Sequence, residues 1–113
     1  MKIQVFKIYN FPTAGFKGAA VTHKDYKELA FIYINAELSP EEQRKTMRHE
    51  IWHCLCGDVL CVMDPDSEDR KQAELEAVKH EADTTLDRIV KDARLWERAV
   101  IADWNKPTEL IFP

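Results

Sequence analysis

His49, Glu50 and His53 form an H-E-x-x-H motif, the pattern in this sequence with the clearest chemical meaning. On a helix, two histidines four residues apart project from one face and can bind a single zinc ion. Glu50 follows the first histidine, where its carboxylate can take a proton from a water activated by the metal and deliver it to a leaving amine. The motif therefore predicts the chemistry of a zinc peptidase, with two histidine ligands and Glu50 as the catalytic base.

The residues around the motif predict that it lies on a helix. Ser39 is a typical N-cap, Pro40 suits the first helical position, and Glu42 completes a capping box. H-E-x-x-H is short enough to arise by chance in a chain with four histidines, and this helical context favours metal binding over that alternative. Apolar residues that can pack inward recur every four positions, and a glycine that can end the helix follows them: Met47, Ile51, Leu55 and Gly57.

Length and charge restrict the classes of protein that fit this sequence. A chain of 113 residues is expected to form a single domain, which we assign to residues 1–113. The net charge of −4 supplies no basic field for nucleic acid. There is neither a signal-peptide pattern nor an apolar run near the roughly 20 residues that cross a membrane. We therefore expect a cytoplasmic protein that binds neither nucleic acid nor membrane.

Three cysteines, Cys54, Cys56 and Cys61, lie directly after the motif. An odd number in one cluster argues against a disulfide framework and for a reducing compartment. Two cysteines separated by one residue on a helix point to different sides, and buried free cysteine is a common apolar filler. We predict core packing for these cysteines rather than metal binding.

The first 35 or so residues predict strands and the remainder predicts helices, which indicates an α+β fold with helices packed against a small antiparallel sheet. Three strands are expected, within residues 3–9, 18–23 and 29–35. The apolar alternation of the first changes phase at Val5 and Phe6, as a bulge would require. The third strand is apolar on both faces and should be central.

The stretch after the motif helix predicts a long C-terminal helix. No glycine or proline occurs between residues 68 and 104, and apolar residues at steps of three and four form one stripe. Unbroken, this helix would extend about 55 Å, whereas a domain of this size is about 35 Å across. Either the helix bends or breaks, or its distal part with Trp96, Val100 and Trp104 projects and forms a homodimer or partner contact.

A catalytic zinc needs a third protein ligand and an open fourth position. The early part of the long helix offers acidic residues and a histidine on two flanks of the apolar stripe, and a glutamate from only one flank can face the histidine pair. The candidates are Glu76, His80 and Asp83 on one flank and Glu74 and Glu81 on the other.

Residues 32–35, the helix start at 38–44 and the segment 47–53, followed by Gly57 and Asp58, resemble the ImmA/IrrE-type zinc metallopeptidases. The resemblance extends over about residues 29–90. It implies a minimal zincin core of the gluzincin-like type, in which a strand precedes the active-site helix and a later helix supplies the third ligand.

In the resembled family that third ligand is a glutamate four residues before Asn, Asp or His. Glu76 and His80 match this spacing, so the resemblance implies Glu76 as the third zinc ligand. Glu81-Ala82-Asp83 makes a competing match. His80 is also a candidate for orienting a zinc histidine or stabilising an oxyanion.

The resemblance implies a peptidase of phages or other mobile elements, often acting on a repressor of those elements. The expected partner is a peptide or protein substrate, which an edge strand near the zinc can bind by adding it to the sheet. The alternative is a non-catalytic protein that binds a regulator, with a vestigial site or a structural zinc. Four protein ligands, including Cys56 or His80, would favour that alternative.

Overall fold

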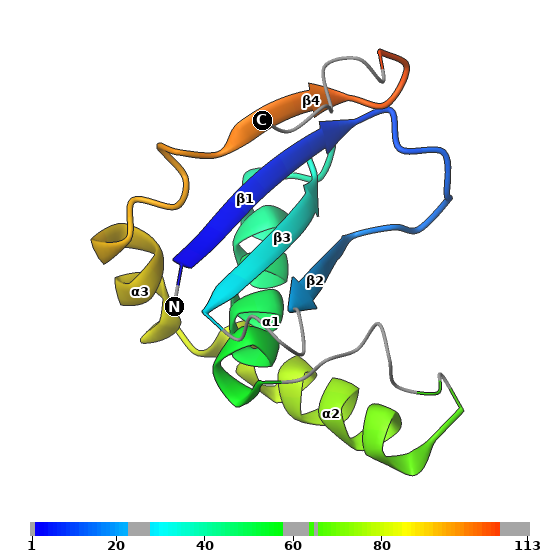
Figure 1. Cartoon of the computed structure of the whole chain (residues 1–113), viewed down its shortest axis with the longest axis vertical. Coiled ribbons are helices and arrows are strands. Elements are labelled where there is room, and N and C mark those ends of the chain that lie inside the picture. The colour runs from blue at the N-terminus through cyan, green and yellow to red at the C-terminus, as the bar shows by residue number, and fades with distance from the viewer. Residues whose placement is uncertain (1, 23–27, 58–63, 65, 107–113) are drawn as a thin grey trace.

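The structure, a computed structural model, describes residues 2–22, 28–57, 64 and 66–106 of the chain. It is an α+β fold in which helices pack on a four-stranded sheet (Figure 1). The elements in chain order are β1 (Lys2–Tyr9), β2 (Gly18–Thr22), β3 (Leu29–Asn35), α1 (Pro40–Cys56), α2 (Glu68–Lys79), the 3₁₀ turn η2 (His80–Ala82), α3 (Leu86–Asp92) and β4 (Val100–Asp103).

The sheet is mixed rather than antiparallel, with strand order β2-β3-β1-β4. β2 pairs antiparallel with β3, but β1 runs parallel to both β3 and β4. The prediction of an α+β fold is confirmed, and so is the interior position of β3. The prediction of three antiparallel strands is wrong, because β1 runs parallel to β3 and a fourth strand pairs with β1.

The predicted bulge at Val5 and Phe6 is also wrong. Pairing of β1 with β3 is continuous, from Lys2 opposite Leu29 to Ile8 opposite Asn35. The apolar alternation changes at Val5 and Phe6 because these consecutive residues are both buried, one on each face of the sheet. Val5 belongs to the core cluster, whereas the ring of Phe6 stacks on that of Tyr33 with centroids 5.3 Å apart.

Local signals fix both ends of α1 as the sequence predicted. The Ser39 hydroxyl accepts a hydrogen bond from the Glu42 amide, and Pro40 opens the helix. Gly57 ends it with φ of 70°, a left-handed conformation that glycine adopts without strain. Met47 and Ile51 are buried as predicted, but Leu55 is 51% exposed, so its predicted place in the core is wrong.

The predicted long C-terminal helix is wrong, because α2, η2, α3 and β4 occupy this region. Asp83 leaves the helical conformation with ψ of 92° and accepts hydrogen bonds from the Thr85 amide and hydroxyl. Such side-chain bonds to the local backbone compete with helix continuation. Of the two alternatives, the break is confirmed, and the distal helix on which the predicted homodimer contact depended does not exist.

The main core lies between the sheet and the helices. Cys54 is fully buried there, as predicted, whereas Cys56 is exposed, so core packing is wrong for Cys56. Cys61 lies outside the described residues. The core consists of Val5, Ala20, Ala30, Ile32, Ile34, Met47, Ile51, Cys54, Leu86, Val90 and Leu95.

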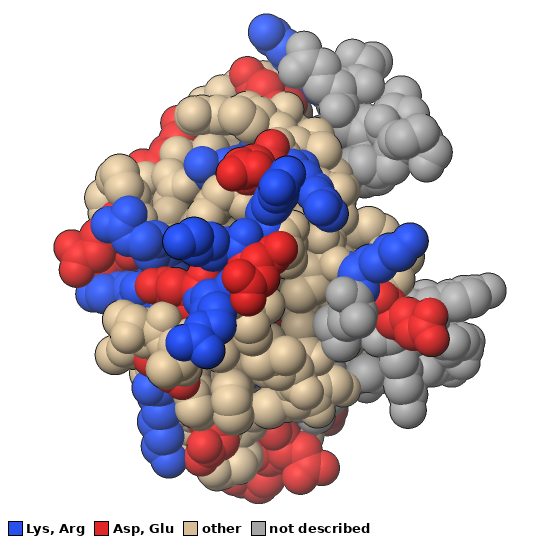
Figure 2. Space-filling model, turned by 90° about the vertical axis from the view of Figure 1, so that its left-hand side faces the viewer, with Lys and Arg blue, Asp and Glu red and all other residues tan. Residues whose placement is uncertain are grey.

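The surface on the side of α3 carries charges of both signs. Figure 2 shows lysine and arginine side chains there among aspartate and glutamate side chains rather than in a field of one sign. Within the described part of the chain, no helix has the length and apolar character needed to span a membrane.

Candidate metal centre

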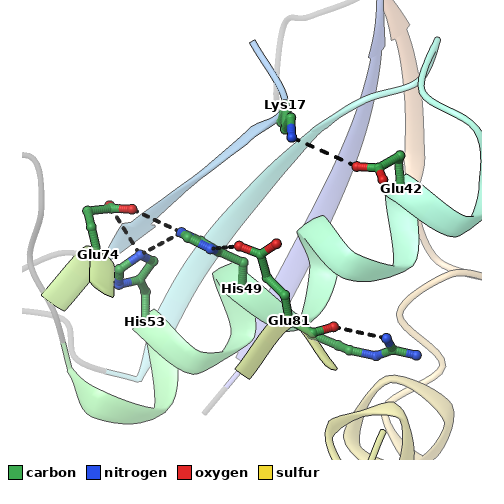
Figure 3. Close-up of polar contacts among 7 residues, drawn as sticks. Lys17, Glu42, His49, His53, Glu74 and Glu81 are labelled. Carbon is green, nitrogen blue, oxygen red and sulfur yellow. Dashed lines mark hydrogen bonds and ion pairs between the residues drawn. The ribbon is translucent and has the colours of Figure 1, made fainter. Parts of the chain in front are cut away.

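The two motif histidines project from α1 and converge beside α2 (Figure 3). Their Nε2 atoms lie 3.2 Å apart, and the two rings meet edge to face. His53 is fully buried, while the side chain of His49 is 15% exposed at the cavity wall. The four-residue spacing therefore brings two possible nitrogen ligands to one point.

Glu74 of α2 completes a group of three possible ligands. Its Oε2 atom lies 3.0 Å from Nε2 of His49, and its Oε1 atom lies 3.2 Å from Nε2 of His53. One ligand atom from each of the three residues lies within 4.8 Å of the others. Two imidazole nitrogens and a carboxylate are the donor set of a catalytic zinc site that leaves a fourth position open.

Glu76, the third ligand implied by the resemblance, lies away from the histidine pair. Its carboxylate accepts hydrogen bonds from Lys79 at 3.0 Å and from Gln72 at 3.3 Å. The bond from Lys79 also holds the pKa of the Glu76 carboxyl below its ordinary value. The structure thus brings Glu74 rather than Glu76 to the histidines.

The other two candidates occupy different positions around the same histidines. Glu81 places its Oε2 atom 2.9 Å from Nδ1 of His49, on the opposite side of the ring from Glu74 (Figure 3). His80 stacks on Trp52 with ring centroids 3.4 Å apart, and its Nδ1 atom lies 3.3 Å from Asp83. Sequence reasoning placed Glu74 and Glu81 on one flank of the second helix, and that flank faces the histidines.

The ring of His49 is held by carboxylates at both nitrogens. Burial disfavours its charged form, but hydrogen bonding to Glu81 and the charges of Glu50 and Glu74 outweigh burial and raise the pKa. A carboxylate on Nδ1 fixes the orientation of the ring and leaves Nε2 to face a metal. Glu81 therefore has the position of an outer partner of the metal centre.

Glu50 has the properties of a base that works near neutral pH. Its residue is 5% exposed, and burial raises the pKa of its carboxyl to about 7. Among the described residues, its buried Oε2 atom has no hydrogen-bond partner. A buried, unpartnered carboxylate oxygen in a residue that lines the same cavity as His49 and Glu74 fits a site built around a metal and a reacting water.

A cavity of about 530 Å³ opens onto these residues and is bordered by the edge strand β2. Gly18 permits the close approach of β2 to α1. A Cβ atom at this position would lie 2.5 Å from Cγ2 of Thr46 and 2.8 Å from the carbonyl oxygen of Tyr33. The cavity lining includes Gly18, Ala19, Ala20, Val21, Thr46, His49, Glu50, Arg70, Glu74 and Glu81.

The raised pKa of Glu50 predicts how the stability of the metal-free protein depends on pH. The folded state keeps the Glu50 proton up to about pH 7, whereas the unfolded chain loses it near the ordinary value of 4.5. The stabilisation is therefore complete below pH 4.5 and is lost as the pH rises to 7, by about 3 kcal/mol. Urea unfolding at pH 5 and pH 8 measures this loss. Glu50→Gln should lose much less stability between these two pH values. Equal losses in both proteins would contradict Glu50 as the source of the pH dependence.

An α+β fold that presents H-E-x-x-H from one helix to a glutamate of the next defines a candidate metallopeptidase. A family model described as the IrrE N-terminal-like domain, a family of peptidases, matches residues 3–84. The chain belongs to this family, and the resemblance to ImmA/IrrE-type proteins is confirmed. No curated protein and no solved structure matched the chain.

Proposed function

We propose that this protein is a zinc-dependent metallopeptidase that hydrolyses a peptide bond in a protein substrate. The observation that carries the proposal is the group of His49, His53 and Glu74, whose ligand atoms lie within 4.8 Å of one another. Glu50 lines the same cavity as His49 and Glu74. Membership of a peptidase family supports this reading of the site.

The residues of the site have two roles, metal binding and proton transfer. A zinc ion held by His49, His53 and Glu74 would supply a Lewis acid that polarises a peptide carbonyl and lowers the pKa of a water. Glu50 takes the proton from the attacking water and then delivers it to the leaving amine. In the metal-free protein its pKa is about 7, and a buried carboxyl group of this kind can lose and regain a proton near neutral pH.

The edge strand β2 supports a peptide as the substrate. Among the described residues, β2 ends the sheet and pairs with β3 along one side only, while its residues from Gly18 to Val21 border the cavity. An extended peptide can bind beside such a strand through main-chain hydrogen bonds. The small side chains of Ala19 and Ala20 leave space for the substrate next to the metal centre.

The substrate we propose is a regulator of a phage or another mobile element. The alternative, a non-catalytic protein with a structural zinc, requires a fourth protein ligand. Cys56 and His80 were the candidates for that ligand. Neither belongs to the group of possible ligands found in the described part of the chain, which favours the open, catalytic type of site.

Metal content tests the proposal most directly. After zinc is supplied and excess metal is removed by exhaustive dialysis, we expect elemental mass spectrometry to find one zinc per chain. The zinc-loaded protein should cleave members of a peptide pool, and removal of the metal with a chelator should stop cleavage. A protein that retains no zinc under these conditions would contradict the proposal.

A further inference from the structure

Arg48 immediately precedes the motif on α1 and connects three elements of the fold. Its Nε and Nη2 atoms donate to the two carboxylate oxygens of Asp87 on α3, at 2.9 and 2.8 Å. Its Nη1 atom donates to the backbone carbonyl of Glu81 in η2, at 3.0 Å. The side chain of Arg48 is only 13% exposed. The two bonds to Asp87 orient the fork-shaped guanidinium, so that Nη1 faces η2.

The turn η2 depends on such external contacts for its position. It contains three residues, and a 3₁₀ turn of this length has few hydrogen bonds of its own. His80 is held by stacking on Trp52, and Glu81 is held through its carbonyl by Arg48. The side chain of the same Glu81 lies on Nδ1 of His49. Glu81 therefore links Arg48 to the first histidine of the metal centre.

We propose that Arg48 is a positioning residue of the metal centre. By fixing the backbone of Glu81 between α1 and α3, it keeps the Glu81 carboxylate on Nδ1 of His49 and so keeps Nε2 facing the metal position. Asp87 contributes by holding the guanidinium in place, and its hydrogen bonds with Arg48 keep the pKa of the Asp87 carboxyl below its ordinary value. This inference rests on the proposed zinc site.

The affinity for zinc is expected to report this role. Loss of an outer partner of a metal ligand typically weakens binding by about 10–100-fold. Arg48 acts through Glu81, so we expect Arg48→Ala to weaken binding near the lower end of that range. Arg48→Lys should recover part of the loss, because an ammonium can reach one partner but cannot reproduce the fork.

The experiment measures the zinc dissociation constant by competition with a chromophoric chelator, in the parent and in each variant. The visible spectrum of the cobalt-substituted proteins provides a second readout, since it changes with ligand geometry. Thermal unfolding of each metal-free protein measures the change in stability separately. The matched control is Arg44→Ala, which removes an exposed arginine one turn earlier on the same helix.

A double variant separates positioning from a general loss of stability. In the Glu81→Gln background, where the carboxylate is already gone, Arg48→Ala should cause little further loss of affinity. Equal losses in both backgrounds would overturn the proposal, as would unchanged affinity and an unchanged cobalt spectrum in Arg48→Ala. If Arg48→Ala does not fold, the same zinc affinities are measured for Arg48→Lys and Asp87→Asn. If the parent protein binds no zinc, the proposed function itself is overturned. If it binds zinc with an affinity that does not change when Arg48 is substituted, only this inference is overturned.

Discussion

Glu50→Gln is expected to bind zinc like the parent protein and to lose peptide hydrolysis by about 10²–10⁴-fold, the range typical of general acid–base catalysis. Glutamine has the same shape as glutamate but cannot accept the proton of the attacking water. The three proposed ligands do not include Glu50, so zinc affinity should change little. Mass spectrometry of a peptide pool, followed over time at equal zinc loading, measures the difference.

Glu42→Gln is the matched control for this variant. Glu42 is on the same helix and lines the same cavity, but it pairs with Lys17 at 3.9 Å (Figure 3). It also pairs with Lys45 at 3.6 Å. Removing this surface charge should leave cleavage within a few-fold of the parent. Parent-like activity in Glu50→Gln would remove the enzyme hypothesis, because no other residue is proposed to accept the proton.

The parts of this fold that the sequence predicts well are those set by neighbouring residues. The α1 helix begins at Ser39 and Pro40 and ends at Gly57 because capping and backbone preference act within one turn. The motif chemistry follows from the same helix, since a four-residue spacing decides which side chains share a face. These features need no knowledge of the rest of the chain.

The parts that failed depend on partners far away in the sequence. Whether β1 runs parallel or antiparallel to β3 depends on the path of the chain between the two strands, and the residues of β1 carry no sign of that choice. Val100 is part of the predicted helical stripe, but it pairs with β1 as a strand, together with Ile101 and Ala102. A short apolar run fits both the helical and the strand periodicity, so its structure depends on the element against which it pairs or packs.

The proposed third ligand shows the same difference between local information and information that depends on distant residues. The helical wheel correctly separated Glu74 and Glu81 from Glu76, because periodicity within α2 is local information. The wheel could not show which flank faces α1, since that depends on how α2 packs and on the break at His80. The Glu76–His80 spacing points to the other flank, where the Glu76 carboxylate pairs with Lys79 and lies outside the group of possible ligands.

Glu74→Ala is expected to cause the largest loss of zinc affinity of any single glutamate substitution in this chain. The variant removes the proposed oxygen ligand, so its loss should exceed the about 10–100-fold expected for Glu81→Ala, which removes a proposed outer partner of His49. Glu76→Ala is the matched control, since its carboxylate is two residues along the same helix and is bound to Lys79. The zinc dissociation constants of the three variants, measured by chelator competition, should follow this order.

A different order of zinc affinity among the three variants would indicate a different arrangement of the site. If Glu81→Ala lost most of the zinc while Glu74→Ala kept it, the Glu81 carboxylate would have to leave Nδ1 of His49 and move to the Nε2 side when metal binds. The roles of two glutamates would then exchange, with the two histidines unchanged as ligands. If Glu76→Ala abolished binding, α2 would have to turn its other flank toward α1, at the cost of the pair between Glu76 and Lys79. The packing of α2 described above would then not be that of the metal-bound protein.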